Sequence, residues 1–226
     1  MGISGQVATG AGGFAGLVLS GSALTTAGTV NLSGRNTGEW GINYGSSASI
    51  TATSGTTTLT GNTTNNSAGK SSFLFISNPT ITLTANPGAA IVFQGGAAGG
   101  TGNSIFNDYN SATVFNTSGD VTFRSVSASA TTAFWGSQGT VGAGAPTFNV
   151  AAGGVLTLDA GVSLMTTGLK VVSNGSSVTI AGSGTGTMSG AMTINAGTLT
   201  YNLAGALTSR ARSGARARWS SRARAR

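Results

Sequence analysis

The stretch "AMTINAGTLTYN", residues 191–202, decides the fold of this chain. It contains two apolar–polar–apolar units, "MTI" and "LTY", and period-two alternation places both apolar side chains of each unit on one face of a strand. Residues 195–197, Asn-Ala-Gly, lie between the units, and Asn and Gly tolerate the left-handed backbone that a tight corner requires. The stretch therefore predicts two short strands joined by a corner, with Ile194 and Leu199 pointing inward.

The same kind of unit recurs along the chain, whereas sustained helical spacing is nearly absent. Further examples are "VNL" at residues 30–32, "ITL" at 81–83, "VTF" at 121–123, "FNV" at 148–150, "LTL" at 156–158 and "VTI" at 178–180. The spacing of the units is about 20 residues, as from Val30 to Ile50 and from Val178 to Leu199. A repeat of this length, built from short strands and tight turns, is typical of a solenoid.

Strands of three to five residues are too short to be stable as isolated hairpins. Stacked coil on coil, each strand pairs with its equivalents about 4.8 Å above and below, and the inward apolar residues form a continuous core. The sequence therefore predicts an all-β fold, a right-handed parallel β-helix (solenoid) over residues 1–209. It would contain roughly nine or ten coils and be about 45 Å long.

An antiparallel sandwich or barrel is the alternative architecture. Its strands would be longer and joined by Asn-Gly or Asp-Gly hairpin turns, but Asn-Gly occurs once, at residues 174–175, and Asp-Gly is absent. A transmembrane barrel needs strands of about ten residues with aromatic girdles, and aromatic residues make up only 7% of this chain. These observations favour the solenoid.

The net charge of +7 is confined to the end of the chain. Four basic residues (Arg35, Lys70, Arg124, Lys170) balance four acidic ones (Glu39, Asp108, Asp120, Asp159) within residues 1–209. A neutral body gives no electrostatic reason to bind nucleic acid or an anionic membrane, so we expect no nucleic-acid partner for residues 1–209. All seven excess arginines lie in residues 210–226.

We expect the Arg/Ala-rich tail, residues 210–226, to be disordered. Its alternating "RAR" pattern is what a GC-rich gene read out of frame would encode, so we interpret it as a frame-slip product. The alternative is an arginine arm that binds polyanions, with affinity that falls steeply as salt rises. Trp219 would then stack on a base.

Two stretches resemble a known family. Residues 189–202, "SGAMTINAGTLTYN", resemble the core of the autotransporter-associated β-strand repeat, roughly G-x-T-x-I-N-x-G-T-L, and residues 29–38, "TVNLSGRNTG", resemble the segment that precedes that core. The residues that carry the first match are Gly190, Thr193, Ile194, Asn195, Ala196, Gly197, Thr198 and Leu199. The intervening coils are similar to filamentous-haemagglutinin-type passengers.

The resemblance implies a β-helical passenger segment of a Gram-negative autotransporter, used as an adhesin or a stalk. It implies an extracellular or cell-surface location at the outer membrane, and an unknown host or cell-surface ligand with no small-molecule substrate. No signal peptide and no translocator barrel are recognisable in the sequence. We therefore expect the chain to be a fragment whose parent protein carries a C-terminal translocator barrel.

Most catalytic chemistries lack their residues here. Without His or Cys there is no Ser-His-Asp triad, cysteine nucleophile or histidine zinc site, so we predict no enzyme, no catalytic or metal-binding residue and no cofactor. The alternative is a β-helical polysaccharide-degrading enzyme fragment, which would need two of the four carboxylates roughly 5–10 Å apart. Asp108, Asp120 and Asp159 occur in turn-like contexts, where we expect them to stabilise the backbone.

The preferred place for a binding surface is the irregular stretch at residues 95–110, because loops that protrude from a regular scaffold usually carry recognition. Within it, "GGTGNSIF" at residues 99–106 nearly matches a calcium-binding nonapeptide, but Ser104 stands where the ligand Asp should be. We interpret it as a turn. The aromatic groups "FLFI" at residues 73–76 and "AFWG" at 133–136 are predicted to be core or loop anchors.

Overall fold

The computed structural model describes residues 2–7, 15–65, 70–97, 104–109, 112–138, 146–163, 169–183, 191–203, 210–213 and 217–221. The regular structure of these residues is entirely β-strand. The strands form two sheets, and within each sheet every pair of neighbouring strands is parallel. The predicted all-β class and the parallel pairing are confirmed.

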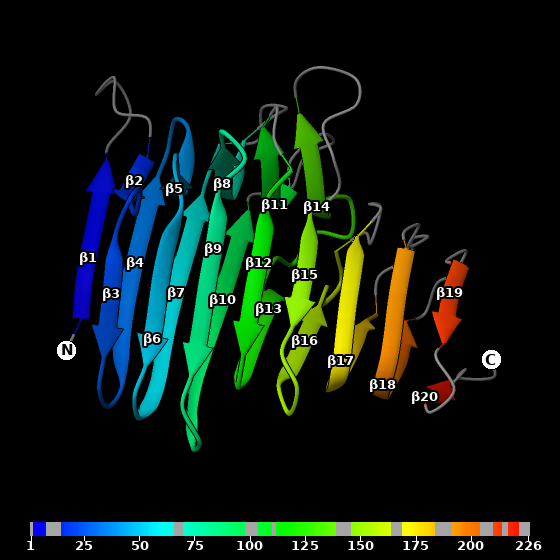
Figure 1. Ribbon diagram of the computed structural model, residues 1–226. Helices are drawn as coiled ribbons and strands as arrows, with labels where there is room; N and C mark the ends of the chain where they lie inside the picture. The colour runs from blue at the N-terminus through cyan, green and yellow to red at the C-terminus, as the bar shows by residue number, and fades with distance from the viewer. Residues whose placement is uncertain are drawn as a thin grey trace.

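From β1 to β13, each strand pairs with the strand three positions further along the chain, so the strands lie in three stacks (Figure 1). The first stack holds β1 Gly2–Val7, β4 Val30–Asn36, β7 Gly55–Thr63, β10 Ala89–Ala97, β13 Asp120–Ser125 and β16 Val155–Asp159. The second holds β2 Ala15–Val18, β5 Trp40–Tyr44, β8 Ser71–Ile76, β11 Ser104–Tyr109 and β14 Ala133–Gln138. The third holds β3 Ala23–Thr26, β6 Ala48–Ala52, β9 Thr80–Ala85, β12 Val114–Ser118 and β15 Thr147–Val150. We call a set of three consecutive strands, one from each stack, a level.

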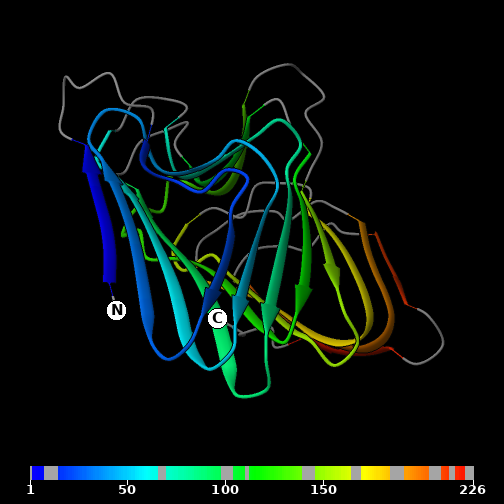
Figure 2. The same cartoon turned by 60° about the vertical axis from the view of Figure 1, so that its left-hand side comes forward.

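Among the described residues, the later levels have two strand segments each. The 13-residue strands β17 Lys170–Gly182 and β18 Ala191–Leu203 each extend the third stack with their first part and the first stack with their second part. In the part of the chain that the structure describes, no strand of the second stack follows β14. Figure 2 shows this change from levels that enclose three sides to levels that wrap around two.

The distance in sequence between neighbouring levels changes with the number of strands in a level. Asn116 and Asn149, on adjacent three-strand levels, are 33 residues apart, whereas Asn174 and Asn195, on adjacent two-strand levels, are 21 residues apart. The predicted period of about 20 residues is therefore confirmed for the two-strand levels and wrong for the three-strand levels, because those levels insert a strand and its connection. With β17, β18 and β20, the first stack contains nine described strands, which at about 4.8 Å per step span about 38 Å.

The corner predicted at residues 195–197 is a bend within the continuous strand β18. Ile194 and Leu199 on its two sides are both buried, as predicted. Gly197 has a φ of 109°, and a Cβ at this position would overlap the carbonyl oxygen of Ser176 on the level before. Only glycine fits both the backbone conformation and the close approach.

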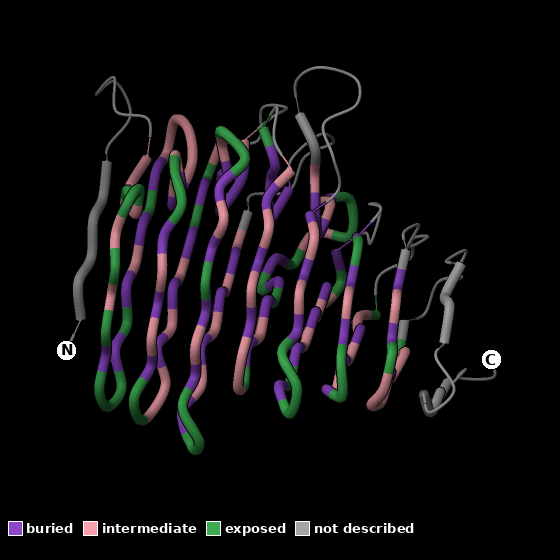
Figure 3. Tube along the Cα trace, viewed as in Figure 1, coloured by how far each residue is buried: buried purple, intermediate pink, exposed green. Residues whose placement is uncertain are grey.

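The core follows from period-two alternation in the first and third stacks. Buried and partly buried residues alternate along these strands (Figure 3), and the inward positions form one apolar cluster. Of the apolar residues predicted to point inward, Tyr201 is partly buried against the cluster. The others are buried: Val30, Leu32, Ile81, Leu83, Val121, Phe123, Phe148, Val150, Leu156, Leu158, Val178, Ile180, Met192, Ile194 and Leu199. The second stack differs, because Ser71–Phe75 of β8 are buried without alternation.

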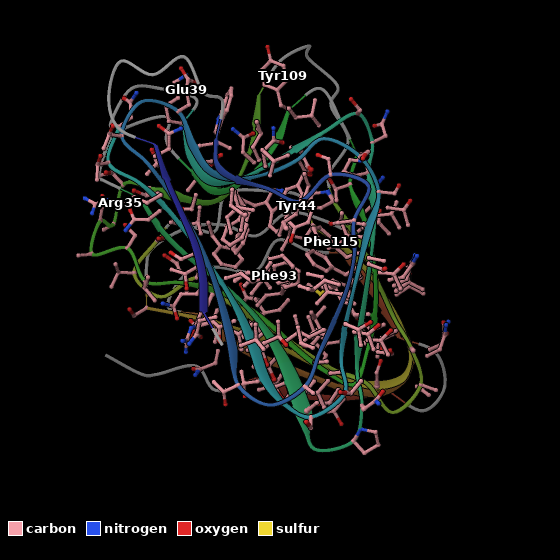
Figure 4. The ribbon with its side chains drawn as sticks, turned by 90° about the vertical axis from the view of Figure 1, so that its left-hand side faces the viewer. Arg35, Glu39, Tyr44, Phe93, Tyr109 and Phe115 are labelled. Atoms are coloured by element: carbon pink, nitrogen blue, oxygen red, sulfur yellow. The ribbon has the colours of Figure 1, made fainter. Side chains whose placement is uncertain are left out.

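Aromatic rings fill the middle of the core, where the three stacks face one another. Rings on paired residues of neighbouring levels lie face to face in every stack: Phe93 on Phe123 at 4.7 Å, Phe115 on Phe148 at 4.9 Å, and Phe106 on Trp135 at 5.0 Å between centroids. Figure 4 shows Tyr44, Phe93 and Phe115 inside the ring of strands, with Arg35, Glu39 and Tyr109 at its periphery. The predicted core role of residues 73–76 and 133–136 is confirmed for Phe73, Phe75, Phe134 and Trp135.

The structure places two segments of the tail in strands. β19 Arg210–Ser213 pairs with the first part of β18, and β20 Ala217–Ser221 pairs with the second part. In these segments the prediction of a disordered tail is wrong, because the outer edge of β18 offers backbone donors and acceptors that an extended chain can satisfy. The frame-slip origin of the tail stays a prediction.

Candidate functional site

A groove crosses the outer surface of the third stack where the three-strand levels meet β17. We call it the polar groove, and its outward-facing lining residues are Thr82, Asn116, Ser118, Asn149, Ala151, Val172 and Asn174, with the buried Thr117 and Val150 beneath. Its volume is about 370 Å³, which is within the range of ligand-binding clefts. The groove therefore has the size of a ligand site.

Strand register builds the wall of the polar groove. Thr82, Asn116, Asn149 and Val172 are paired residues on four successive levels. The Asn149 side chain donates a hydrogen bond of 2.9 Å from Nδ2 to Oδ1 of Asn116, so the two amides form a ladder. The same pattern recurs nearby, where Asn195 Nδ2 donates to Oδ1 of Asn174. Register thus aligns side chains that are distant in sequence into a row of amides and hydroxyls.

The chemistry of the polar groove is neutral. None of its lining residues carries a charge. Lys170, two residues before Val172 on β17, is a charged residue that flanks it. Amides and hydroxyls both donate and accept hydrogen bonds. Such a surface suits an uncharged ligand rich in hydroxyl groups, and it lacks the cluster of cations that binds phosphate or sulfate strongly.

Sequence analysis did not propose Asn116 or Asn149 as binding residues. The signal that marks them is the repeated pair Phe115-Asn116 and Phe148-Asn149, in which the ring points inward and the amide therefore points outward. Since Asn116 and Asn149 are 33 residues apart, a search for a shorter period does not align them. Knowledge of the three-strand level is needed to find this site.

The four acidic side chains lie in different settings. Glu39 forms an ion pair with Lys70, whose Nζ lies 4.9 Å from the centroid of the Trp40 ring. Asp159 Oδ1 accepts a 2.9 Å hydrogen bond from the backbone of Gly161, which confirms its predicted turn role. Asp120 is exposed at the start of β13 and pairs with Val155. Asp159 is at the other end of β16 from Val155. The rise along the strand and the step between the two strands together set the backbone positions of Asp120 and Asp159 about 14 Å apart.

The prediction of a turn role for Asp108 is wrong. Asp108 lies on β11 with a fully buried side chain. It accepts hydrogen bonds from Trp135 Nε1, at 3.1 Å, and from the hydroxyl of Thr113. The local sequence "FNDYN" resembles a turn, but pairing with β8 and β14 keeps it extended. The register sets Asp108 beside Phe75, so its side chain points into the core.

The stretch at residues 95–110 is not an irregular loop in its described parts. Gly95–Ala97 belong to β10 and Ser104–Tyr109 form β11, which corrects that expectation. Ser104 is buried on β11. The rest of the nonapeptide-like motif, residues 99–103, lies outside the described residues, as do residues 98, 110 and 111.

The part of the chain that the structure describes offers neither a metal site nor a membrane-spanning helix. Its residues include no group of three or more acidic, His or Cys side chains that could hold a metal ion. Within the same residues, no helix is long and apolar enough to cross a membrane.

No comparison with known proteins tests the resemblance of residues 189–202 to the autotransporter-associated repeat, so it stays a prediction. The chain matches no protein-family model, no curated protein and no solved structure.

Proposed function

We propose that residues 1–209 form a right-handed parallel β-helix that serves as a structural and adhesive segment of a bacterial cell-surface or secreted autotransporter-like protein. The observation that carries the proposal is the uninterrupted parallel pairing between successive levels, from β1 to β18. Connections between parallel strands of one sheet are right-handed in about 98% of cases. The strand order therefore supports a right-handed coil.

The outer surface of the first stack supports a structural role. Its outward positions include a register-aligned row of hydroxyls, Thr122, Thr157, Thr179 and Thr200. Neutral hydroxyl side chains interact with water and have no net attraction for polyanions. A stack with an apolar interior and such a surface is suited to hold other parts of a protein away from the cell.

Localisation of the chain on intact cells tests the proposal. We expect an antibody raised against the purified chain to label unlysed cells of the source organism or their culture medium. Brief protease treatment of intact cells should remove the cell-bound signal, and deletion of the gene should reduce attachment to surfaces or to other cells. Label that requires lysis and resists external protease would overturn the proposal.

A further inference from the structure

We propose that the polar groove binds an uncharged oligosaccharide laid across successive levels. This inference rests on the proposed function only for its biological setting, since a surface segment meets the glycans of neighbouring cells. The site itself is argued from the side chains of the third stack.

The first argument is hydrogen-bonding chemistry. The bond from Asn149 to Asn116 uses one Nδ2 hydrogen of Asn149 and a lone pair of Asn116 Oδ1. The Nδ2 group of Asn116 and the Oδ1 atom of Asn149 remain as a donor and an acceptor. The hydroxyl of Thr82 adds a group that does both. Sugar hydroxyls also donate and accept, so this lining complements a saccharide.

The second argument is spacing. Thr82, Asn116 and Asn149 occupy one residue column, and neighbouring levels are about 4.8 Å apart. A polymer of similar units can therefore repeat one set of contacts from level to level. A compact ligand would fill only part of this row.

The third argument concerns charge and affinity. The lining is uncharged, so it exerts no electrostatic attraction on an acidic glycan. Lys170 beside the groove is cationic and would attract such a glycan, so a Lys170 variant shows whether charge contributes to binding. No aromatic side chain is among the lining residues. The groove therefore lacks the stacking contact on a ring face that would increase its affinity for a sugar. We therefore expect weak binding, with a Kd on the order of 1 mM.

Titration followed by NMR tests the proposal on the full chain. The neutral probes are maltohexaose, cellohexaose and xylohexaose, and the acidic probe is hexagalacturonate. We expect at least one neutral probe to shift the side-chain amide signals of Asn116 and Asn149 saturably. Asn149→Ala removes the Asn149 amide and the ladder bond, and should raise the Kd about tenfold.

Two further variants complete the design. Asn31→Ala makes the same change at an exposed position on the first stack, and it should leave the Kd unchanged. A thermal unfolding curve for each variant shows that it is folded. The proposal is overturned if the amide shifts do not saturate with any neutral probe at a concentration of about ten times the expected Kd. It is also overturned if Asn31→Ala and Asn149→Ala weaken binding equally. Binding of hexagalacturonate alone, lost in Lys170→Gln, also overturns it. Failure of the cell-surface test would leave these binding results unchanged, so the two proposals fail separately.

Discussion

The carboxylate Oδ2 of Asp108 accepts a 3.1 Å hydrogen bond from the indole Nε1 of Trp135, and both side chains are fully buried. Thr113, also fully buried, donates its hydroxyl to the other carboxylate oxygen. The cluster joins β11 and β14 of the second stack to the segment that enters β12 of the third. Because a buried polar group that loses its partner costs about 1–3 kcal/mol, these three residues depend on one another.

Trp135→Phe should lower the free energy of unfolding by about 2–4 kcal/mol, because it removes both volume and the donor to Asp108. Urea unfolding of Trp135→Phe, Asp108→Ala and the double variant separates these effects. We expect a coupling energy of about 1–2 kcal/mol between the two sites. If the destabilisation of the double variant equals the sum of the two single variants, Asp108 and Trp135 do not interact directly.

Gly197→Ala should lower the free energy of unfolding by about 3 kcal/mol or more. The new Cβ would overlap the Ser176 carbonyl, and the positive φ of residue 197 would strain the alanine backbone. Gly175 provides the matched control at the same corner of the preceding level. It also has a positive φ, of 80°, but a Cβ there would meet nothing within 4 Å. Gly175→Ala should therefore lower the free energy of unfolding by only about 1–2 kcal/mol. Equal losses for the two variants would show that the overlap with the Ser176 carbonyl does not destabilise Gly197→Ala.

Tyr44 should make the protein lose stability at alkaline pH. Burial raises the pKa of the Tyr44 hydroxyl far above its usual range, and this hydroxyl has no hydrogen-bond partner. The folded state keeps the proton when the unfolded chain loses it near pH 10, so the stabilisation is complete below that pH and declines above it, by about 1.4 kcal/mol per pH unit.

Tyr44→Phe is the test of that prediction. It should be neutral or stabilising by about 1 kcal/mol at pH 7, because it deletes an unsatisfied buried group, and it should flatten the alkaline decline. A small slope will remain from Tyr201, because burial also raises its pKa. Urea unfolding at pH 8, 10 and 11 measures both effects. A decline as steep in Tyr44→Phe as in the parent chain would refute the assignment.

Deletion of residues 210–226 should increase self-association. β19 and β20 pair with β18, so their removal leaves the edge of a 13-residue strand unpaired, and long open edges pair with other chains. Sedimentation velocity of the truncated and full chains over a range of concentrations measures the change. Monomeric behaviour of the truncated chain at every concentration would show that the tail does not protect this edge.

The alternating pattern of the first and third stacks was sufficient to predict which residues face the core. Ile81 and Leu83, or Leu156 and Leu158, flank a polar residue and have one buried face, so period two identifies them. The second stack was missed because "SSFLFI" at residues 71–76 is buried on both faces and has no alternation. Without that stack, the repeat length of the early levels could not be deduced.

The candidate site was missed for a related reason. Asn116 and Asn149 become neighbours only through strand register, and a separation of 33 residues is invisible to a local pattern. The role of Asp108 likewise depends on Trp135, 27 residues later and one level further along the stack. Local turn chemistry explains Asp159 because its partner, Gly161, is two residues away.

The stacked aromatic rings extend from Tyr44 on β5 to Phe148 on β15, so the largest buried side chains belong to the central levels. In a protein whose levels contact only their neighbours, each level opens according to its own packing. Limited proteolysis should therefore trim the chain from both ends and leave a resistant fragment around β5–β15. Under a stretching force, the terminal levels should unravel first, and the aromatic centre should be the last part to yield.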